Sequence, residues 1–306
     1  MMYILLIIGF ILLIKGADFF VAGSSSIARL LKVPSVVIGL TIVAMGTSAP
    51  EAAVSITAGL AGSNELALSN VIGSNIFNLV LIVGVCALIK PFLIDETLLK
   101  KDFPLAILGS VFLYFLVKDG QLSRIEGFIL LILMVVYLIT TVISAIRNPA
   151  ESEDEEAPLP MYKSIIFIII GLIGIIFGGD LVVDNACAIA AAFGLSETLI
   201  GLTIVAIGTS LPELVTSVTA SRKGESGLAL GNVVGSNIFN IMFILGLSSS
   251  IHPIAADPLS LIDIPLLIVS TTIIFIFCKI RKEMGRYMGA LCVAAYVLYS
   301  IYIVIR

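Results

Sequence analysis

An internal duplication restricts the fold of this chain more than any other feature. Residues 39–84 align with residues 201–246 without a gap, at an offset of 162 positions, and 28 of the 46 aligned pairs are identical. The match extends weakly backward, where GADFFV at 16–21 falls on GGDLVV at 178–183. The sequence therefore predicts that the chain is built from two copies of one structural unit.

The apolar content predicts that both copies lie in a membrane. Hydrophobic residues make up 59% of the 306 residues and charged residues 12%, and the mean hydropathy is +1.17. Soluble domains are nearer to half apolar and a quarter charged. A run of roughly 20 apolar residues can span the bilayer as a helix. Ten such runs are expected: 2–23, 36–61, 66–89, 103–117, 125–146, 162–186, 198–220, 227–250, 259–279 and 285–305.

Each half then holds five of these spans, in residues 1–147 and 162–306, with a linker at 148–161. Because five is odd, the second half must enter the membrane from the opposite side. The predicted fold is an all-α integral membrane protein with ten transmembrane helices, arranged as two inverted-topology repeats of five. Folds of this kind place substrate sites near the membrane midplane, between the halves and on interrupted helices.

Basic residues set the expected orientation. With the N-terminus outside, the cytoplasmic loops hold 13 Lys and Arg residues, and the outer loops and C-terminus hold three, while Lys15 lies within the first span. Both termini are therefore predicted to be extracytoplasmic, in a multi-pass protein of the plasma membrane. The acidic stretch ESEDEE at 151–156 is interpreted as a solvated cytoplasmic linker. A weak cation-sensing segment is the alternative, but the stretch lacks the ligand spacing of a calcium-binding loop.

A proline and a carboxylate interrupt one apolar run in each half. The sequence GTSAPE occupies residues 46–51, and GTSLPE repeats it at 208–213. Pro50 has no N–H, so the carbonyl of Gly46 loses its helical partner and the helix is distorted there. Inside a membrane, backbone groups without a helical hydrogen bond are tolerated only where they face protein, water or a ligand. The motif therefore predicts a broken helix that offers carbonyl oxygens to a ligand.

The side chains of the same motif supply further oxygens. Glu51 follows Thr47 by four residues and Ser48 by three, so the three side chains share one helix face with the freed carbonyls. An ionisable residue at this depth costs roughly 2.5 kcal/mol or more and is by default a functional candidate. The second half repeats the arrangement with Thr209, Ser210, Pro212 and Glu213.

A polar stripe follows in each half. SNVIGSNIFN at 69–78 spaces Asn70, Ser74 and Asn78 four residues apart, on one face of a helix. The second half repeats the stripe with Asn232, Ser236 and Asn240. Hydrogen bonding between helices explains a single Ser or Asn equally well. A stripe that faces a buried Glu in both halves favours an ion site.

The donors are hard oxygens, which favours Ca²⁺ and Na⁺ over soft transition metals. The four cysteines are scattered without ligand spacing, and the single histidine, His252, falls in a predicted outer loop. Glu51 and Glu213 together carry a charge of −2, which one Ca²⁺ or two protons would neutralise. Three Na⁺ would leave +1, and exchange would then depend on membrane voltage by about 2.3 kcal/mol per charge per 100 mV.

The paired motifs GTSAPE…GSNIFN and GTSLPE…GSNIFN resemble those of the cation/Ca²⁺ exchanger superfamily, in particular its prokaryotic Na⁺/Ca²⁺ exchanger-like members with two alpha repeats. The resemblance covers nearly the whole chain. It implies that Glu51 and Glu213 bind Ca²⁺ with backbone carbonyls of Thr47 and Thr209. It implies Na⁺ sites formed by four serines and two backbone carbonyls: Ser48, Ser74, Ser210, Ser236, Ala44 and Ala206.

The resemblance also implies that Asn78 and residue 240 line the central site, and that the first and sixth helices slide against a fixed core. Members of the superfamily carry either Asp or Asn at the position of Asn240. The Asn in this chain removes one protonatable group, which leaves open whether Na⁺ or H⁺ is exchanged for Ca²⁺.

Secondary antiport of Ca²⁺ against Na⁺ is therefore the expected function, and Ca²⁺/H⁺ antiport by the same fold is the alternative. An ion channel is less favoured. An intramembrane hydrolase using Ser48 or Ser210 is disfavoured, because neither serine has a His or Lys partner at a suggestive spacing. The expected partners are inorganic cations and the lipid bilayer. We expect no enzymatic activity, no cofactor, no nucleic acid and no obligatory protein partner.

Overall fold

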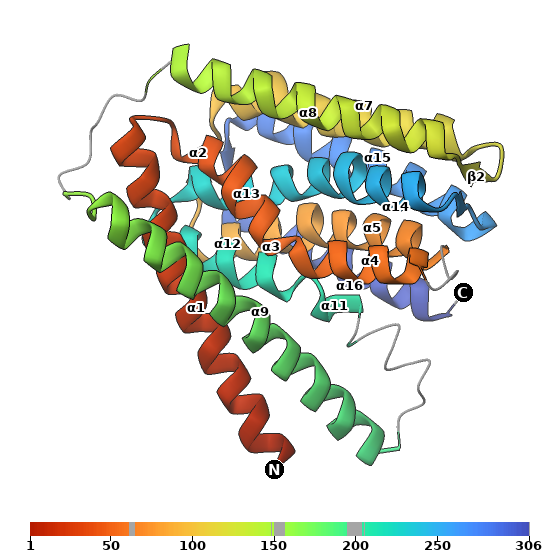
Figure 1. Ribbon diagram of the computed structural model, residues 1–306, viewed down its shortest axis with the longest axis horizontal. Helices are drawn as coiled ribbons and strands as arrows, with labels where there is room; N and C mark the ends of the chain where they lie inside the picture. Colours follow the sequence, from red (N-terminus) through yellow and green to blue (C-terminus); the bar gives the residue numbers. More distant parts are fainter. Residues whose placement is uncertain (61–64, 148, 150–156, 195–203, 205, 306) are drawn as a thin grey trace.

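The computed structural model describes residues 1–60, 65–147, 149, 157–194, 204 and 206–305, and this part of the chain is almost entirely helical (Figure 1). One bent pair of helices, Ser35–Thr47 with Ala49–Thr57, forms a further span if it is counted as one. Seven other segments are long and apolar enough to cross a membrane: Met2–Leu31, Ala67–Ile89, Arg124–Arg147, Met161–Ala192, Ser226–Ile251, Pro258–Arg281 and Arg286–Ile305. The described chain is thus an all-α membrane protein with seven or eight apolar spans.

Two of the ten expected spans are not in this count. The expected span 103–117 is the 15-residue helix α7 (Phe103–Val117), which continues from the wide turn η3 (Leu98–Asp102). The expected span 198–220 lies partly outside the described residues, and the described part holds α11 (Ala206–Gly208) and α12 (Leu211–Lys223). Each helix by itself is shorter than the roughly 20 residues that cross a bilayer. The number ten stays a prediction.

The other elements of the first half, in chain order, are α1 (Met2–Leu31), α2 (Ser35–Ile38), η1 (Gly39–Val43), α3 (Ala44–Thr47), α4 (Ala49–Leu60), α5 (Glu65–Ile76), η2 (Phe77–Ile82), α6 (Val83–Ile89), β1 (Phe92–Leu93), β2 (Gln121–Leu122) and α8 (Arg124–Arg147). Those of the second half are α9 (Met161–Ala192), α13 (Ser226–Phe239), η5 (Asn240–Leu245), α14 (Gly246–Ile251), β3 (Ile254–Ala255), α15 (Pro258–Arg281), β4 (Glu283–Met284) and α16 (Arg286–Ile305). The η segments are short π-helical turns, which are frequent at functional sites.

Helix α1 is longer than the apolar run 2–23 predicts, because polar residues continue it inside the protein. Ser24, Ser25 and Ser26 are buried against other helices, so they need no contact with lipid or water. The helix ends where Lys32 takes the left-handed conformation. Hydropathy alone marks where a helix stops facing lipid, and packing decides where the helix itself ends.

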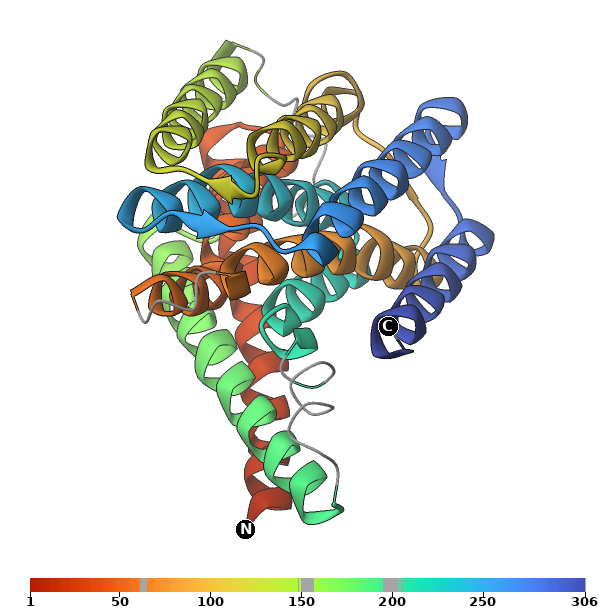
Figure 2. The ribbon, with the colours of Figure 1, turned by 90° about the vertical axis from the view of Figure 1, so that its right-hand side faces the viewer.

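Helices α1 and α9 form a crossed pair that extends beyond the other helices (Figures 1 and 2). Glycines allow the two backbones to touch. A Cβ atom added to Gly16 would lie 2.8 Å from the carbonyl oxygen of Gly171, and one added to Gly171 would lie 2.7 Å from that of Gly16. Small residues at such a crossing let membrane helices pack closely. The two helices therefore pack most closely on each other, and α1 also shares a hydrophobic cluster with η1, α12 and α13 of the bundle.

Helix α13 lies at the centre of that bundle. It begins the apolar segment Ser226–Ile251, in which 94% of an 18-residue stretch is buried. It packs against η1 of the other half, where a Cβ atom on Gly235 would lie 2.7 Å from the Cα atom of Leu40. The two repeated segments thus contact each other directly through their glycine faces.

Two small antiparallel sheets join the halves at the ends of the bundle. Strand β1 pairs with β4, with Phe92 opposite Met284, and β2 pairs with β3, with Gln121 opposite Ala255. The residues of β3 lie 162 positions after those of β1, and those of β4 lie 162 positions after those of β2. The two sheets are therefore equivalent under the sequence repeat, and each takes one strand from each half.

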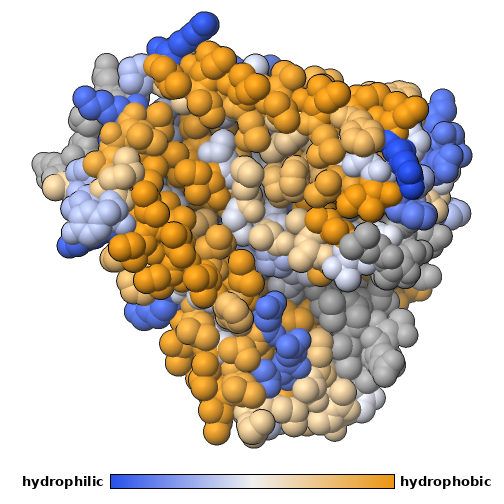
Figure 3. All heavy atoms as spheres, in the orientation of Figure 1, coloured by the Kyte–Doolittle hydropathy of each residue, from blue (hydrophilic) through white to orange (hydrophobic). Residues whose placement is uncertain are grey.

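The face of the molecule that Figure 3 shows is largely apolar over the described residues. On α8, Ile125 is 74% exposed and Ile132 is 62% exposed, and many other large aliphatic side chains are exposed in the same way. A water-soluble protein rarely leaves so much continuous apolar surface uncovered. Such a surface is suited to the acyl chains of a bilayer.

Candidate cation site

Both glutamate motifs lie at helix breaks. Ser48 ends α3 with φ −82° and ψ 8°, and Ser210 precedes α12 with φ −94° and ψ 7°. Pro50 and Pro212 fall in the first turn of the helix that follows each break. An N–H in the first turn has no intrahelical partner, so a proline there costs no hydrogen bond. The break thus restarts the helix and leaves each glutamate in its first turn.

Each glutamate is bound by the serine of the other half. Ser48 Oγ donates to Glu213 Oε1 over 2.8 Å, and Ser210 Oγ lies 3.1 Å from Glu51 Oε1. Ser210 Oγ is also 3.1 Å from Ser74 Oγ, which brings the polar stripe to the same point. Both carboxylates and both serines are fully buried. The repeats therefore build one site between them, with crossed contacts.

The second carboxylate oxygen of each glutamate, and three other buried side-chain oxygens of the repeated motifs, have no hydrogen-bond partner within the described chain. They are Glu51 Oε2, Glu213 Oε2, Asn78 Oδ1, Thr209 Oγ1 and Asn240 Oδ1. The ion pairs found in the described residues involve neither carboxylate. Buried polar groups are normally bonded, and buried charges are normally paired. This set of oxygens is therefore suited to a cation that would complete it.

Some of the predicted oxygens already make hydrogen bonds in this conformation, and each keeps a lone pair for a cation. Thr47 Oγ1 donates within its own helix to Val43 O over 3.1 Å, or to Asn232 Oδ1 over 3.0 Å. The carbonyl of Ala44 accepts the Ser48 N–H over 3.1 Å. Ser236 is fully buried and its Oγ has no hydrogen-bond partner in the described chain, and Ala206 begins the short helix α11.

Sequence reasoning did not single out Asn75 and Asn237, the two asparagines inside GSNIFN. Asn75 Nδ2 donates to the backbone carbonyl of Asn237 over 3.2 Å, and Asn237 Nδ2 donates to that of Asn75 over 2.9 Å. Asn240 Nδ2 donates to Asn75 Oδ1 over 3.0 Å. The signal that could have found them is their identity in both copies of the repeat, since an exposed asparagine would have no reason to be duplicated in register.

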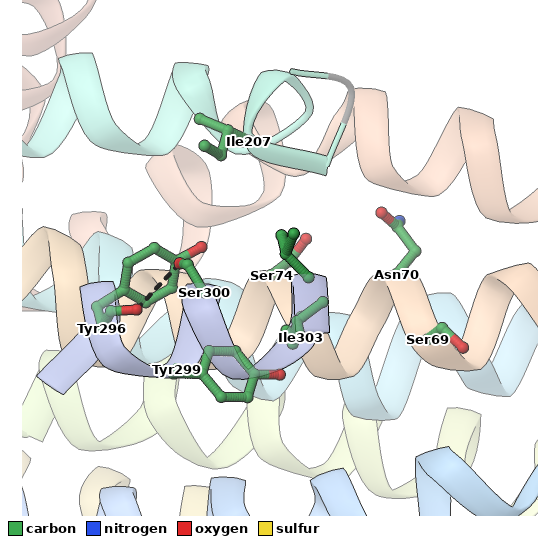
Figure 4. Close-up of a pocket in the computed structure, with 10 residues that line it drawn as sticks. Ser69, Asn70, Ser74, Ile207, Tyr296, Tyr299, Ser300 and Ile303 are labelled. Atoms are coloured by element: carbon green, nitrogen blue, oxygen red, sulfur yellow. Dashed lines mark hydrogen bonds between the residues drawn. The ribbon is translucent and has the colours of Figure 1, made fainter. Parts of the chain in front are cut away.

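Two cavities approach the site from one end of the bundle. One of about 120 Å³ is lined by Asn70 and Ser74 of α5, by Ile207 of α11 and by Tyr296 and Tyr299 of α16 (Figure 4). Ser74 therefore links a cavity wall to the crossed serine–glutamate contacts.

The second cavity, of about 480 Å³, lies beside α9. Its wall includes Asp180 and Asp184 of α9, Pro50 and Pro212 of the two breaks, and Thr209. Both cavities reach residues of the repeated motifs. The buried oxygens are thus close to two cavities within the described chain.

These features define a class: an α-helical membrane protein with a buried, oxygen-lined cation site between two broken helices. Comparison with known proteins identifies the family. The family model for the sodium/calcium exchanger protein matches residues 1–143 and 163–305, so the chain belongs to that family. The family and the fold support a cation/Ca²⁺ antiporter in a membrane.

Individual relatives agree over nearly the full length. The chain is 38% identical to the putative antiporter CaxA of Alkalimonas amylolytica, over 97% of each chain. It is 33% identical to the sodium/calcium exchanger MaX1 of Methanosarcina acetivorans, over 98% of this chain and 97% of that one. A solved structure of the sodium-calcium exchanger NCX_Mj superposes with a TM-score of 0.87, at 37% identity and over 97% of each chain.

Proposed function

We propose that this chain exchanges Ca²⁺ for Na⁺ across the membrane, by alternating access to the site between its two halves. The crossed contacts carry the proposal, because they bring two carboxylates together with one oxygen of each left without a partner. Two ionised carboxylates in a dry interior cost several kcal/mol unless a cation or protons neutralise them. One Ca²⁺ would balance their charge, and Na⁺ would replace it when Ca²⁺ leaves.

The proposed architecture is ten transmembrane helices in two inverted repeats of five. The equivalent sheets β1–β4 and β2–β3 support it, as does the antiparallel crossing of α1 and α9, since each relates one half to the other. In this arrangement α7 together with η3, and α11 together with α12, supply the two spans that fall short alone. Both termini are extracytoplasmic, and the protein is placed in the plasma membrane.

Alternating access is supported by the difference between the two ends of the site. Asn70 lies on a cavity wall, whereas its counterpart Asn232, 162 positions later, is fully buried. An inverted repeat can exchange these surroundings by moving the α1–α9 pair relative to the bundle. The ion would then reach the opposite face without an open pore at any time.

Ca²⁺ uptake into proteoliposomes under separately imposed gradients tests the coupling. We expect an outward Na⁺ gradient to drive uptake at constant pH, and a pH gradient without Na⁺ to drive none. Uptake driven by the pH gradient alone would replace Na⁺ by H⁺ as the coupling ion. Single-channel currents in planar bilayers would instead show a channel and would refute antiport.

A hydrolytic role for Ser48 or Ser210 has no support in the geometry. Each hydroxyl contacts a carboxylate, and the single histidine of the sequence, His252, follows α14 and is exposed. The proposed protein is a transporter of inorganic cations and not an enzyme, and it uses no cofactor, nucleic acid or obligatory protein partner.

A further inference from the structure

The amide network at the centre of the bundle has a fixed polarity. A backbone carbonyl only accepts hydrogen bonds, so the side-chain atom of Asn75 that faces the carbonyl of Asn237 must be Nδ2. The other side-chain atom, Oδ1, therefore faces Asn240 and accepts from its Nδ2. Asn240 in turn has its own Oδ1 left over, and this oxygen has no partner in the described chain. A chain of donors starting at one carbonyl thus decides which atom residue 240 presents to the ion site.

The repeat contains the same network a second time, but there it is incomplete. Asn237 Nδ2 donates to the carbonyl of Asn75, which leaves its Oδ1 as the acceptor for the residue that corresponds to Asn240 under the repeat, Asn78. Asn237 Oδ1 and both side-chain atoms of Asn78 nevertheless have no hydrogen bond in the described chain, although all three atoms are buried. Leaving buried polar atoms unbonded costs about 1–3 kcal/mol each. Of the two equivalent hydrogen bonds, the one between Asn240 and Asn75 is therefore formed, and the one between Asn78 and Asn237 is not.

We infer that Asn75 and Asn237 are positioning residues that turn the amide oxygens of Asn240 and Asn78 toward the transported ion, one in each of two access states. In the present conformation Asn75 holds Asn240. In an inverted repeat the opposite conformation exchanges the surroundings of residues 162 positions apart, and within the bundle this exchange requires the asparagine side chains to turn while the α1–α9 pair moves. There Asn237 Oδ1 accepts from Asn78 Nδ2, and Asn240 is released. This inference rests on the proposed function, because it assigns a role in binding the ion at that same site.

The test measures Ca²⁺ half-saturation separately at the two faces of oriented proteoliposomes. We expect Asn75→Ala to raise half-saturation about fivefold to tenfold at one face and Asn237→Ala to do so at the opposite face, since each removes about one hydrogen bond. Asn185→Ala is the matched control: Asn185 is also buried and donates to a backbone carbonyl, over 2.7 Å, but lies on α9 away from the network. Equal shifts at both faces, or shifts no larger than that of the control, would overturn the inference.

A double-mutant cycle separates positioning from general loss of packing. Because Asn75 acts through its contact with Asn240, adding Asn75→Ala to Asn240→Ala should raise half-saturation no further at that face. A further rise as large as that of Asn75→Ala alone would contradict a positioning role.

The same pair of substitutions distinguishes failure of this inference from failure of the proposed function. If wild type takes up no Ca²⁺ under either gradient, the proposed function fails, and the role in ion binding fails with it. The network itself is then read from thermal unfolding in detergent without Ca²⁺. Asn75→Ala and Asn240→Ala together should lower stability by less than the sum of their separate effects, because both break the same hydrogen bond. Losses that add in full would show that the donor chain is wrong.

Discussion

Asn70 and Asn232 occupy the same place in the two repeats and share one equivalent contact, to Ser55 and to Ser217, but they differ in burial and in their contact with the opposite half. Asn232 is fully buried and bonds to Thr47, and to Ser217 over 2.9 Å. Asn70 is half-buried on a cavity wall, and its Nδ2 donates to Ser55 Oγ over a longer distance, 3.4 Å. Their local sequences are nearly identical, so the difference is conformational. A single conformation of an inverted repeat closes one end of the site and opens the other.

We expect the largest effect from substituting the buried glutamate that both halves contain. Glu51→Gln and Glu213→Gln each eliminate one of the two buried negative charges, and the remaining −1 cannot balance Ca²⁺. We expect either substitution to lower Na⁺-driven Ca²⁺ uptake at least a hundredfold, measured with radioactive Ca²⁺ in proteoliposomes. Amounts of folded protein should stay near wild type by size-exclusion chromatography. Normal uptake by either variant would separate that carboxylate from transport.

A second substitution should separate the closed end from the open one. Asn232→Ala leaves Ser217 without its buried donor and removes an acceptor from Thr47, so unfolding free energy should fall by about 2 kcal/mol. Asn70→Ala should cost less than about 1 kcal/mol, because water in the cavity can replace its weak contact. Unfolding by a denaturing detergent compares the two. Equal losses would mean that the two ends are equally closed in the membrane.

The crossed serine contacts give a smaller effect. Ser48→Ala and Ser210→Ala each remove a charge-assisted hydrogen bond to the opposite glutamate, and we expect Ca²⁺ half-saturation to rise about tenfold. Ser48→Thr and Ser210→Thr keep the hydroxyl and serve as controls. Ser210 contacts both Glu51 and Ser74, so its loss should be the greater of the two. An effect of Ser48→Ala equal to that of its threonine control would indicate that the hydroxyl is not used.

The smallest effect is expected where the halves differ in sequence. Glu96 bonds to Lys100 and to Lys282 of the other half, and these contacts lower the pKa of its carboxyl below the usual value. A lowered pKa stabilises the folded state above the unfolded-state pKa, and the contribution is lost as pH falls. Because Glu96 is fully exposed, its pairs are screened by solvent. Glu96→Gln should leave the melting temperature unchanged at neutral pH, and a clear decrease would show that this contact helps hold the halves together.

Much of the fold was predictable because membranes impose strict rules on sequence. Apolar length located seven spans directly, and Pro50 and Pro212 correctly marked helix breaks. Helix ends were less predictable, since the serines that follow the apolar run of α1 are buried in protein rather than exposed to water. The predicted number of ten transmembrane helices remains to be tested by experiment, because α7 is short and residues 198–220 are described only in part.

The residue types of the candidate site also followed from the sequence. A glutamate in an apolar run needs a compensating partner, and its duplication predicted two such groups. Sequence alone could not assign the partners, because nothing in GTSAPE states that Ser48 bonds to Glu213 rather than to Glu51 three residues away. Asn75 and Asn237 were missed for the same reason, since their bonds join segments 162 residues apart.

The sequence by itself thus determined that this protein lies in a membrane, that it is duplicated, and that its candidate ion ligands are oxygen atoms. Hydropathy, residue type and repeat spacing are properties of the sequence that do not depend on how the helices are arranged. Only the tertiary structure decided which oxygens meet and which half is closed. Each repeated segment packs against the other, so the two segments cannot make identical contacts at the same time. Packing between the halves therefore selects one of two equivalent conformations.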